Sequence, residues 1–298
     1  MKAKVAFIWQ GITGRYGVWN DGLRQAMRIL EKEYEVTYHE PKDQIPEDAV
    51  VLYWEAPCTI NGKDGENYKR VMNLPNKKIL LFAGGPLKKE WVSKFDHVCV
   101  ESKINADECK EQGIKHSTAF GINDNVFTHI KTKKEYDGIH HGTSASWKRQ
   151  WLVGEAIGDK ALIVGRYQKE DPYPFDRCRE LGCTVMNEQT PDALSYLINK
   201  CHTCVQTSEF WGGGQRCTLE AMACGVPVIC MSDSPKNREY VEESGFGLVV
   251  DPDPNKIKEA VEQVKSKSFD PKIGVEYIKN KWTARHYADS LKSAICQL

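Results

Sequence analysis

Residues 218–229 read TLEAMACGVPVI, a pattern that predicts a short helix, a glycine that ends it, and a buried strand beyond a proline. Gly225 suits the left-handed position after a helix, and Pro227 prevents the helix from continuing. Glu220 is expected in the first turn, where the helix dipole favours a carboxylate and backbone N–H groups remain available to an anion. An acidic side chain beside such an anion site is typical of a segment that binds a nucleotide.

The length, charge and cysteine content of the chain set wide limits. Its 298 residues suffice for two domains of about 100–150 residues each. Lysine plus arginine and aspartate plus glutamate both number 41, so the zero net charge does not indicate a nucleic acid or an anionic membrane as partner. The 11 cysteines follow no disulfide framework, and we find neither an apolar leader nor about 18 consecutive apolar residues. We therefore expect a cytoplasmic protein with reduced thiols and no transmembrane segment.

The first half of the chain alternates short apolar runs with helical patterns. A helix is predicted over residues 18–33, after a glycine-punctuated loop at residues 11–17. Strands are predicted at residues 5–9, 36–39, 49–54, 79–83 and 97–100. Such alternation favours an α/β fold with a parallel sheet that is covered on both faces.

The second half repeats this alternation. Strands are predicted at residues 160–164, 204–206, 226–230 and 247–250, and helices at residues 191–198, 255–265 and 283–295. Residues 131–135, KTKKE, form a short charged segment without apolar side chains, and we place the domain junction there. The sequence therefore predicts two Rossmann-like, doubly wound domains that face a cleft.

Five segments, in matching order, resemble the retaining glycosyltransferase family 4, also called group 1. They are residues 119–127, 142–148, 190–194 and 219–228, together with Trp282 and the helix after it. The resemblance implies the GT-B fold, with an N-terminal acceptor domain at residues 1–130 and a donor domain at residues 136–282. It also implies that a C-terminal helix, at about residues 283–298, crosses back to the first domain.

The same resemblance implies a reaction: a sugar moves from a nucleoside diphosphate to a hydroxyl acceptor with retained configuration. A UDP-sugar is the favoured donor, and no metal is expected to be required. Glu220 would accept hydrogen bonds from the ribose hydroxyls, and Lys148 with Arg149 would neutralise the charge that grows on the leaving diphosphate. A helix-terminal charge and a solvated Lys–Arg pair are the alternative interpretations of these residues.

Three departures from the family pattern alter the expected donor pocket. The family has two glutamates eight positions apart. Counted back from Glu220, the first falls on Gly212, so this carboxylate is missing here unless Glu209 replaces it. The arginine of the diphosphate loop falls on Thr143, and a histidine that is common after a first-domain strand is absent at residues 83–85. The other donor-binding candidates adjoin these positions and are Gly212, Gly213, Gly214, Arg216, Thr218, Leu219 and Arg166.

The first domain offers candidates for contact with the acceptor and the diphosphate. Gly14 and Arg15 belong to a loop that faces both groups in the family. Asn20 and Asp21 stand at the start of the next predicted helix, where helix capping explains them about as well. Glu55 ends a strand and is a candidate to orient an acceptor hydroxyl, with a solvated strand end as the alternative.

Two other functions stay open. Trp9, Arg15, Tyr16, Trp19 and Arg24 bring aromatic and basic side chains together, which suits stacking on bases. A modified nucleobase in DNA, of the hydroxymethyl-pyrimidine type, is therefore an alternative acceptor. The missing glutamate and histidine are also compatible with a catalytically silent protein that binds nucleotide sugars.

Features that imitate metal sites are interpreted as structural. The CHTC sequence at residues 201–204 has no second cysteine pair and lies at a predicted helix-to-strand junction. The DPD sequence at residues 251–253 follows a strand and is interpreted as a turn. His140 and His141 end a strand and are weaker candidates for a place near the diphosphate. No metal site is predicted.

Overall fold

The computed structural model describes residues 2–10, 21–55, 65–209 and 215–298. The chain forms two compact units, Met1–Gly121 with Thr283–Leu298, and Ile122–Trp282. Residues 131–135, at which the sequence analysis places the junction, lie inside the second unit. There the Lys134 ammonium donates to the carbonyls of Asn199 and Cys201, both at 2.8 Å, which holds this charged segment against the unit.

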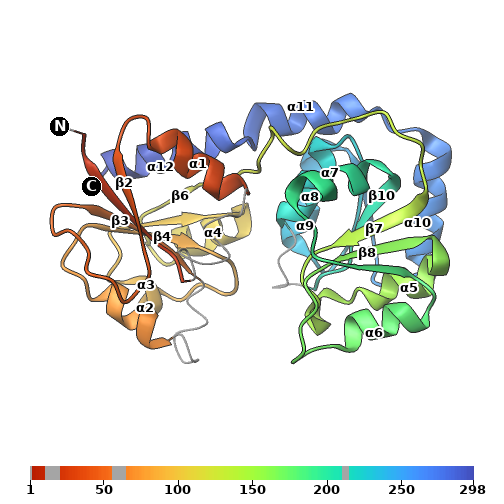
Figure 1. Cartoon of the computed structure of the whole chain (residues 1–298), viewed down its shortest axis with the longest axis horizontal. Helices are drawn as coiled ribbons and strands as arrows, with labels where there is room; N and C mark the ends of the chain where they lie inside the picture. The colour runs from red at the N-terminus through yellow and green to blue at the C-terminus, as the bar shows by residue number, and fades with distance from the viewer. Residues whose placement is uncertain (1, 11–20, 56–64, 210–214) are drawn as a thin grey trace. The chain divides into compact units, whose positions relative to one another are not determined.

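The first unit is built on a parallel sheet of six strands in the order β2-β1-β3-β4-β5-β6 (Figure 1). Its strands are β1 (Lys4–Ile8), β2 (Glu35–His39), β3 (Val50–Glu55), β4 (Lys78–Phe82), β5 (His97–Val100) and β6 (His116–Thr118). Its helices are α1 (Gly22–Leu30), α2 (Gly65–Met72), α3 (Lys89–Val92), α4 (Lys103–Glu111) and α12 (Ala284–Cys296).

Strand alternation divides the first unit's core into two layers. Val5 and Phe7 of β1 belong to an apolar cluster with α1 and α12, whereas Ala6 and Ile8 belong to a cluster on the opposite face. Side chains of a strand point alternately to its two faces, so uninterrupted apolar strands require a cover on both. The C-terminal α12 provides part of that cover, since its Leu291 is fully buried in the first cluster.

The second unit also has a six-stranded parallel sheet, in the order β12-β11-β10-β7-β8-β9. Its strands are β7 (Tyr136–His141), β8 (Ala161–Gly165), β9 (Thr184–Asn187), β10 (Cys201–Gln206), β11 (Val228–Met231) and β12 (Gly247–Val250). Its longer helices are α5 (Trp151–Ile157), α6 (Tyr173–Glu180), α7 (Pro191–Asn199), α8 (Gln215–Ala223), α9 (Pro235–Ser244), α10 (Pro254–Lys267) and α11 (Pro271–Lys281). Two single turns of 3₁₀ helix, η3 (Ser146–Lys148) and η4 (Gly158–Lys160), flank α5.

Strand order reverses once in each sheet, between β1 and β3 in the first and between β7 and β10 in the second. Ligands of open α/β sheets bind outside the carboxyl ends of the strands at such a switch point. In the second unit this edge holds the ends of β7 and β10 and the loops that follow them. The expected α/β architecture of two doubly wound units is confirmed.

The segments that imitate metal sites have structural roles. Cys201 and Cys204 are both fully buried in β10. Asp253 caps α10, where its carboxylate accepts hydrogen bonds from the backbone N–H groups of Asn255 and Lys256 at 2.8 and 3.1 Å. None of the described helices is long and apolar enough to cross a membrane.

Candidate active site

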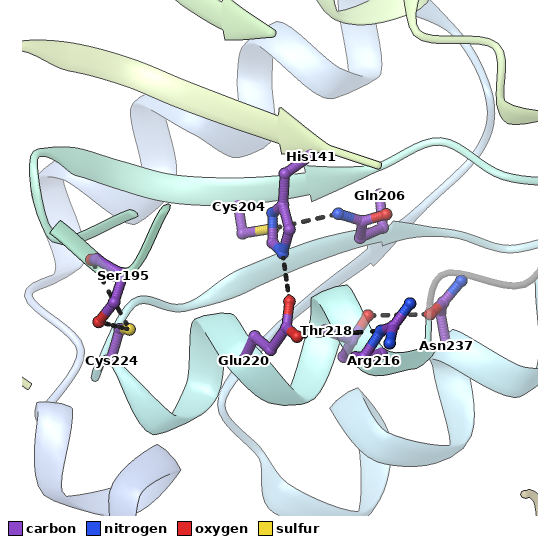
Figure 2. A network of polar contacts seen from close by, with 9 residues as sticks. All are labelled: His141, Ser195, Cys204, Gln206, Arg216, Thr218, Glu220, Cys224 and Asn237. Carbon is purple, nitrogen blue, oxygen red and sulfur yellow. Dashed lines mark hydrogen bonds and ion pairs between the residues drawn. The ribbon is translucent and has the colours of Figure 1, made fainter. Parts of the chain in front are cut away.

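His141 is the last residue of β7 and lies at the switch point of the second sheet. Its ring is 2% exposed, and Nε2 lies 3.1 Å from Glu220 Oε2, while Nδ1 lies 3.9 Å from Cys204 Sγ (Figure 2). Burial alone lowers the pKa of His141, but the thiols of Cys217 and Cys204 and the Glu220 carboxylate together raise it well above 6.5. His141 Nε2 therefore faces a buried carboxylate, and the raised pKa of the ring favours its protonated form.

Helix α8 carries Glu220, but not in its first turn. The helix begins at Gln215, so Glu220 is its sixth residue, and the first turn holds no acidic side chain. The expectation that the helix dipole holds this carboxylate is therefore wrong, because that effect fades within one turn. His141 holds the carboxylate instead. The predicted end of the helix is confirmed by Gly225, which has φ +65°.

Lys148 closes the 3₁₀ turn η3 and is only 8% exposed. A Cβ placed on Gly142 would lie 2.6 Å from Lys148 Nζ and 3.7 Å from Cys217 Sγ, so the ammonium and the thiol border the same space. Gly142 also has φ +136°, a conformation that side chains disfavour. Burial, together with the charges of Arg216 and Arg166, lowers the pKa of Lys148, although the Cys217 thiol opposes this shift.

Arg149 points elsewhere and acts as an anchor for this turn. Its guanidinium makes a two-pronged ion pair with Asp233 at 2.7 and 2.8 Å, and its Nε donates to the Thr207 carbonyl at 2.8 Å. The Thr207 hydroxyl in turn donates to the Lys148 carbonyl at 2.6 Å. The structure thus engages Arg149 in fixing the backbone that carries Lys148.

The other donor candidates fall into three environments. Thr218 and Leu219 are fully buried, and the Thr218 hydroxyl donates to Asn237 Oδ1 at 2.8 Å, so their side chains belong to the interior. Thr143 and Arg166 lie in the loops after β7 and β8, where their carbonyls accept bonds from Gln150 Nε2 and from the Ser144 N–H.

Two further donor candidates are more open to solvent. Arg216 lies with its Nε 3.9 Å from Glu220 Oε1, and its side chain is 48% exposed. Glu209 is exposed, and its N–H donates to the Trp147 carbonyl at 3.0 Å. Gly212, Gly213 and Gly214 lie outside the described residues.

In the first unit, Glu55 ends β3 at the switch point, as expected for a strand-end carboxylate. Asp21 is the N-cap of α1, and its carboxylate accepts from the Arg24 N–H at 2.9 Å, which supports the capping interpretation. Trp9 is 7% exposed and packs on Trp54, so it is part of the core rather than an open stacking surface. Gly14, Arg15 and Asn20 lie outside the described residues.

Sequence reasoning missed Cys217 and the polar end of β10. Gln206, Thr207 and Ser208 are buried where β10 ends, and the Gln206 amide oxygen and the Ser208 hydroxyl have no hydrogen-bond partner among the described residues. Polar residues directly after a buried apolar strand were the available signal for these positions. For Cys217 the signal was its three-residue spacing from Glu220, which puts both side chains on one helix face.

Comparison with known proteins identifies this region. Residues 151–266, from α5 to α10, match the family model described as Glycosyl transferases group 1. This part of the second unit is therefore similar to glycosyltransferases of group 1. Helix α8 with Glu220 lies inside the matched range, whereas His141 and Lys148 precede it. The resemblance to group 1 glycosyltransferases and the expected enzyme class are confirmed by this match.

Solved structures share the fold over the whole chain. Sucrose-phosphate synthase from Thermosynechococcus elongatus gives a TM-score of 0.74 at 13% identity and covers 99% of each chain. HepE from Anabaena, solved with UDP and glucose, gives 0.73 at 11% identity and covers 100% of each chain. A glycosyltransferase from Rickettsia africae gives 0.66 at 13% identity, covering 99% of this chain and 97% of its own. No curated protein sequence matches the chain.

Proposed function

We propose that the group 1 domain binds a nucleoside-diphosphate sugar, favourably a UDP-sugar, and that the enzyme transfers its sugar to a hydroxyl acceptor with retention. The observation that carries this proposal is the burial of two side chains of opposite charge type near the sheet's switch point. Lys148 and Glu220 are 8% and 6% exposed, and both lie near Cys217. Retention itself is carried over from the family resemblance.

Glu220 is proposed to accept hydrogen bonds from the ribose. Its Oε2 takes the bond from His141 at 3.1 Å, whereas Oε1 lies 3.9 Å from Arg216 Nε, beyond hydrogen-bond distance. His141 therefore fixes the carboxylate through one oxygen, and the second, whose partner among the described residues is the Arg216 ion pair, is proposed to accept from a hydroxyl donor. His141 takes the part of a positioning residue in this proposal.

Lys148 is proposed to stabilise the leaving diphosphate. A buried ammonium interacts with developing negative charge more strongly than a solvated one, because water does not screen it. The Thr207 hydroxyl and the Arg149 anchor hold the turn that carries it, so little reorganisation accompanies the transfer. This electrostatic role needs no metal ion.

Structural relatives support the identity of the donor. HepE has been solved with UDP-glucose and with UDP, and it shares the fold of this chain at 13% and 12% identity. We infer from this likeness that uracil is the favoured base. The first unit is proposed to bind the acceptor, with Glu55 at its switch point orienting the reacting hydroxyl.

The first test is nucleotide binding, measured by thermal shift and calorimetry with UDP, GDP, ADP and CDP. A ligand at 100 times its dissociation constant adds about 2.7 kcal/mol of stability. We expect UDP to raise the melting temperature of the wild type and Glu220→Ala to weaken UDP binding by about 1–3 kcal/mol. Glu259→Ala, which removes an exposed carboxylate on α10, is the control and should bind UDP normally.

Binding without turnover would separate the silent alternative from an enzyme. Release of UDP from UDP-sugars, followed over time, measures turnover even before the acceptor is known. Failure of every nucleotide to bind folded wild type would contradict the proposed function.

A further inference from the structure

His141, Cys217 and Glu220 bring three kinds of metal ligand together in the second unit. One ligand atom from each lies within 4.8 Å of the others, and the three residues are 2%, 9% and 6% exposed. His141 Nε2 and Glu220 Oε2 lie 3.1 Å apart. We refer to these three residues as the His–Cys–Glu cluster.

A helix and a strand of the second unit carry the His–Cys–Glu cluster. Cys217 and Glu220 lie one turn apart on α8, and His141 is fixed at the end of β7. The second ring nitrogen of His141 faces Cys204 Sγ at 3.9 Å, and Cys204 is contacted in turn by Gln206 Nε2 at 3.3 Å (Figure 2). Such outer contacts orient a histidine for metal binding.

The donor atoms select a class of metal ion. A thiolate, an imidazole nitrogen and a carboxylate oxygen form a mixed set that suits Zn²⁺ and other borderline-soft divalent cations. Three protein ligands leave one tetrahedral position open. A thiol, an imidazole and a carboxylate are not the all-oxygen set that Mg²⁺ or Ca²⁺ prefers.

Charge around the cluster both favours and limits a bound cation. With neutral histidine, the thiolate and the carboxylate supply two negative charges, which balance a divalent ion. Metal ligands must be deprotonated, so binding of a cation would be accompanied by release of protons. The nearby charges of Lys148 and Arg216 oppose a cation, so we expect weaker affinity than at a structural zinc site.

We propose that the His–Cys–Glu cluster binds a thiophilic divalent cation of the Zn²⁺ class, and that the bound cation competes with the nucleotide for Glu220. The competition rests on the proposed function, because it requires Glu220 to hold the ribose. The metal site itself does not. Zinc would then act as an inhibitor of donor binding, with reciprocal effects of each ligand on the affinity of the other.

The metal site is tested with Co²⁺ added to the full-length protein after treatment with EDTA. We expect a near-ultraviolet absorption band from a thiolate–cobalt bond, absent from Cys217→Ser. Glu220→Gln should keep the band and weaken Co²⁺ binding at least tenfold, which provides a second variant if Cys217→Ser fails to fold. The control is Cys296→Ser, because Cys296 is an exposed thiol outside the cluster. A band that disappears with Cys296 and survives Cys217→Ser overturns the site, as does the absence of any band.

The competition is tested by titrating UDP in EDTA and in excess Zn²⁺. We expect Zn²⁺ to weaken UDP binding at least tenfold in the wild type. Free zinc also binds the diphosphate, and this contribution appears equally in Cys217→Ser, so only the difference between the two proteins counts. Equal zinc effects in both proteins overturn the competition.

The two tests also separate this proposal from the proposed function. UDP binding in EDTA without a Cys217-dependent cobalt band removes the metal site and leaves the proposed function standing. A Cys217-dependent cobalt band without any UDP binding supports the metal site and contradicts the proposed function.

Discussion

At the scale of single residues, substitution of Lys148 tests the proposed electrostatic role most directly. We expect Lys148→Met to lower the rate of sugar transfer by about 10²–10³-fold, as seen when one preorganised charge-stabilising donor is removed. Methionine fills similar volume, so the fold should persist. The rate of UDP release from the donor sugar measures the effect, and UDP affinity should fall less than the rate. A rate within threefold of wild type would exclude an electrostatic role for this ammonium.

Substitution of Gly142 is expected to lower the transfer rate by displacing Lys148. An alanine there would put its Cβ 2.6 Å from Lys148 Nζ, at φ +136°, so the ammonium must move. We expect Gly142→Ala to lower the transfer rate nearly as much as Lys148→Met. Because both changes remove the same interaction, Gly142→Ala should cost little further rate in a Lys148→Met background.

Gly182→Ala is the matched control for this prediction. Gly182 has φ +81° with no atom within 4 Å of an added Cβ, so its substitution brings backbone strain without a contact. Equal loss of activity in the two alanine variants would show that strain, rather than displacement of Lys148, is the cause.

At the scale of elements, two helix ends form a natural pair. Gly225, after α8, and Gly245, after α9, have φ +65° and +63°. An added Cβ at Gly245 meets nothing within 4 Å, whereas at Gly225 it lies 2.7 Å from Pro271 Cβ and 2.8 Å from His129 Nδ1. We expect Gly245→Ala to cost about 1–2 kcal/mol for the left-handed backbone alone.

Gly225→Ala should cost about 1–3 kcal/mol more than Gly245→Ala, because overpacking adds to the same backbone strain. The difference in urea-unfolding midpoint between the two variants measures this addition. Equal midpoints would mean that α11 and the chain near His129 move aside for the added Cβ without loss of stability.

The elements also show how far sequence reasoning reaches. Apolar runs predicted β5 and β12 at residues 97–100 and 247–250, but they gave no strand at β6 or β9, which are short and only partly buried. The start of α8 was missed because residues 215–217, Gln-Arg-Cys, carry no capping signal. Glu220 and Lys148 are site candidates from the sequence, but the pairing of Glu220 with His141 depends on tertiary packing that joins β7 to α8. No local pattern encodes that contact.

At the scale of the whole molecule, acid should destabilise the first unit through a buried histidine. His97 of β5 is 1% exposed, its Nε2 lies 2.9 Å from the Ser117 hydroxyl, and its Nδ1 is buried without a partner among the described residues. Burial, with the nearby charges of Lys115 and His116, lowers the pKa of His97 to about 4. The unfolded chain titrates near 6.5, so it binds more protons than the folded first unit between these values.

Stability from His97 is therefore complete above pH 6.5 and is lost as the pH falls toward 4, by at most about 3 kcal/mol. We expect calorimetry to place the transition of the first unit at a lower temperature at pH 5 than at pH 7.5. His97→Gln keeps a partner for Ser117 and should reduce this difference, while His39, whose pKa is also lowered by burial, retains part of it. UDP should raise only the transition of the second unit, because its proposed site lies there. If UDP also raises the transition that His97→Gln alters, the acid-sensitive histidine and the nucleotide belong to the same cooperative unit.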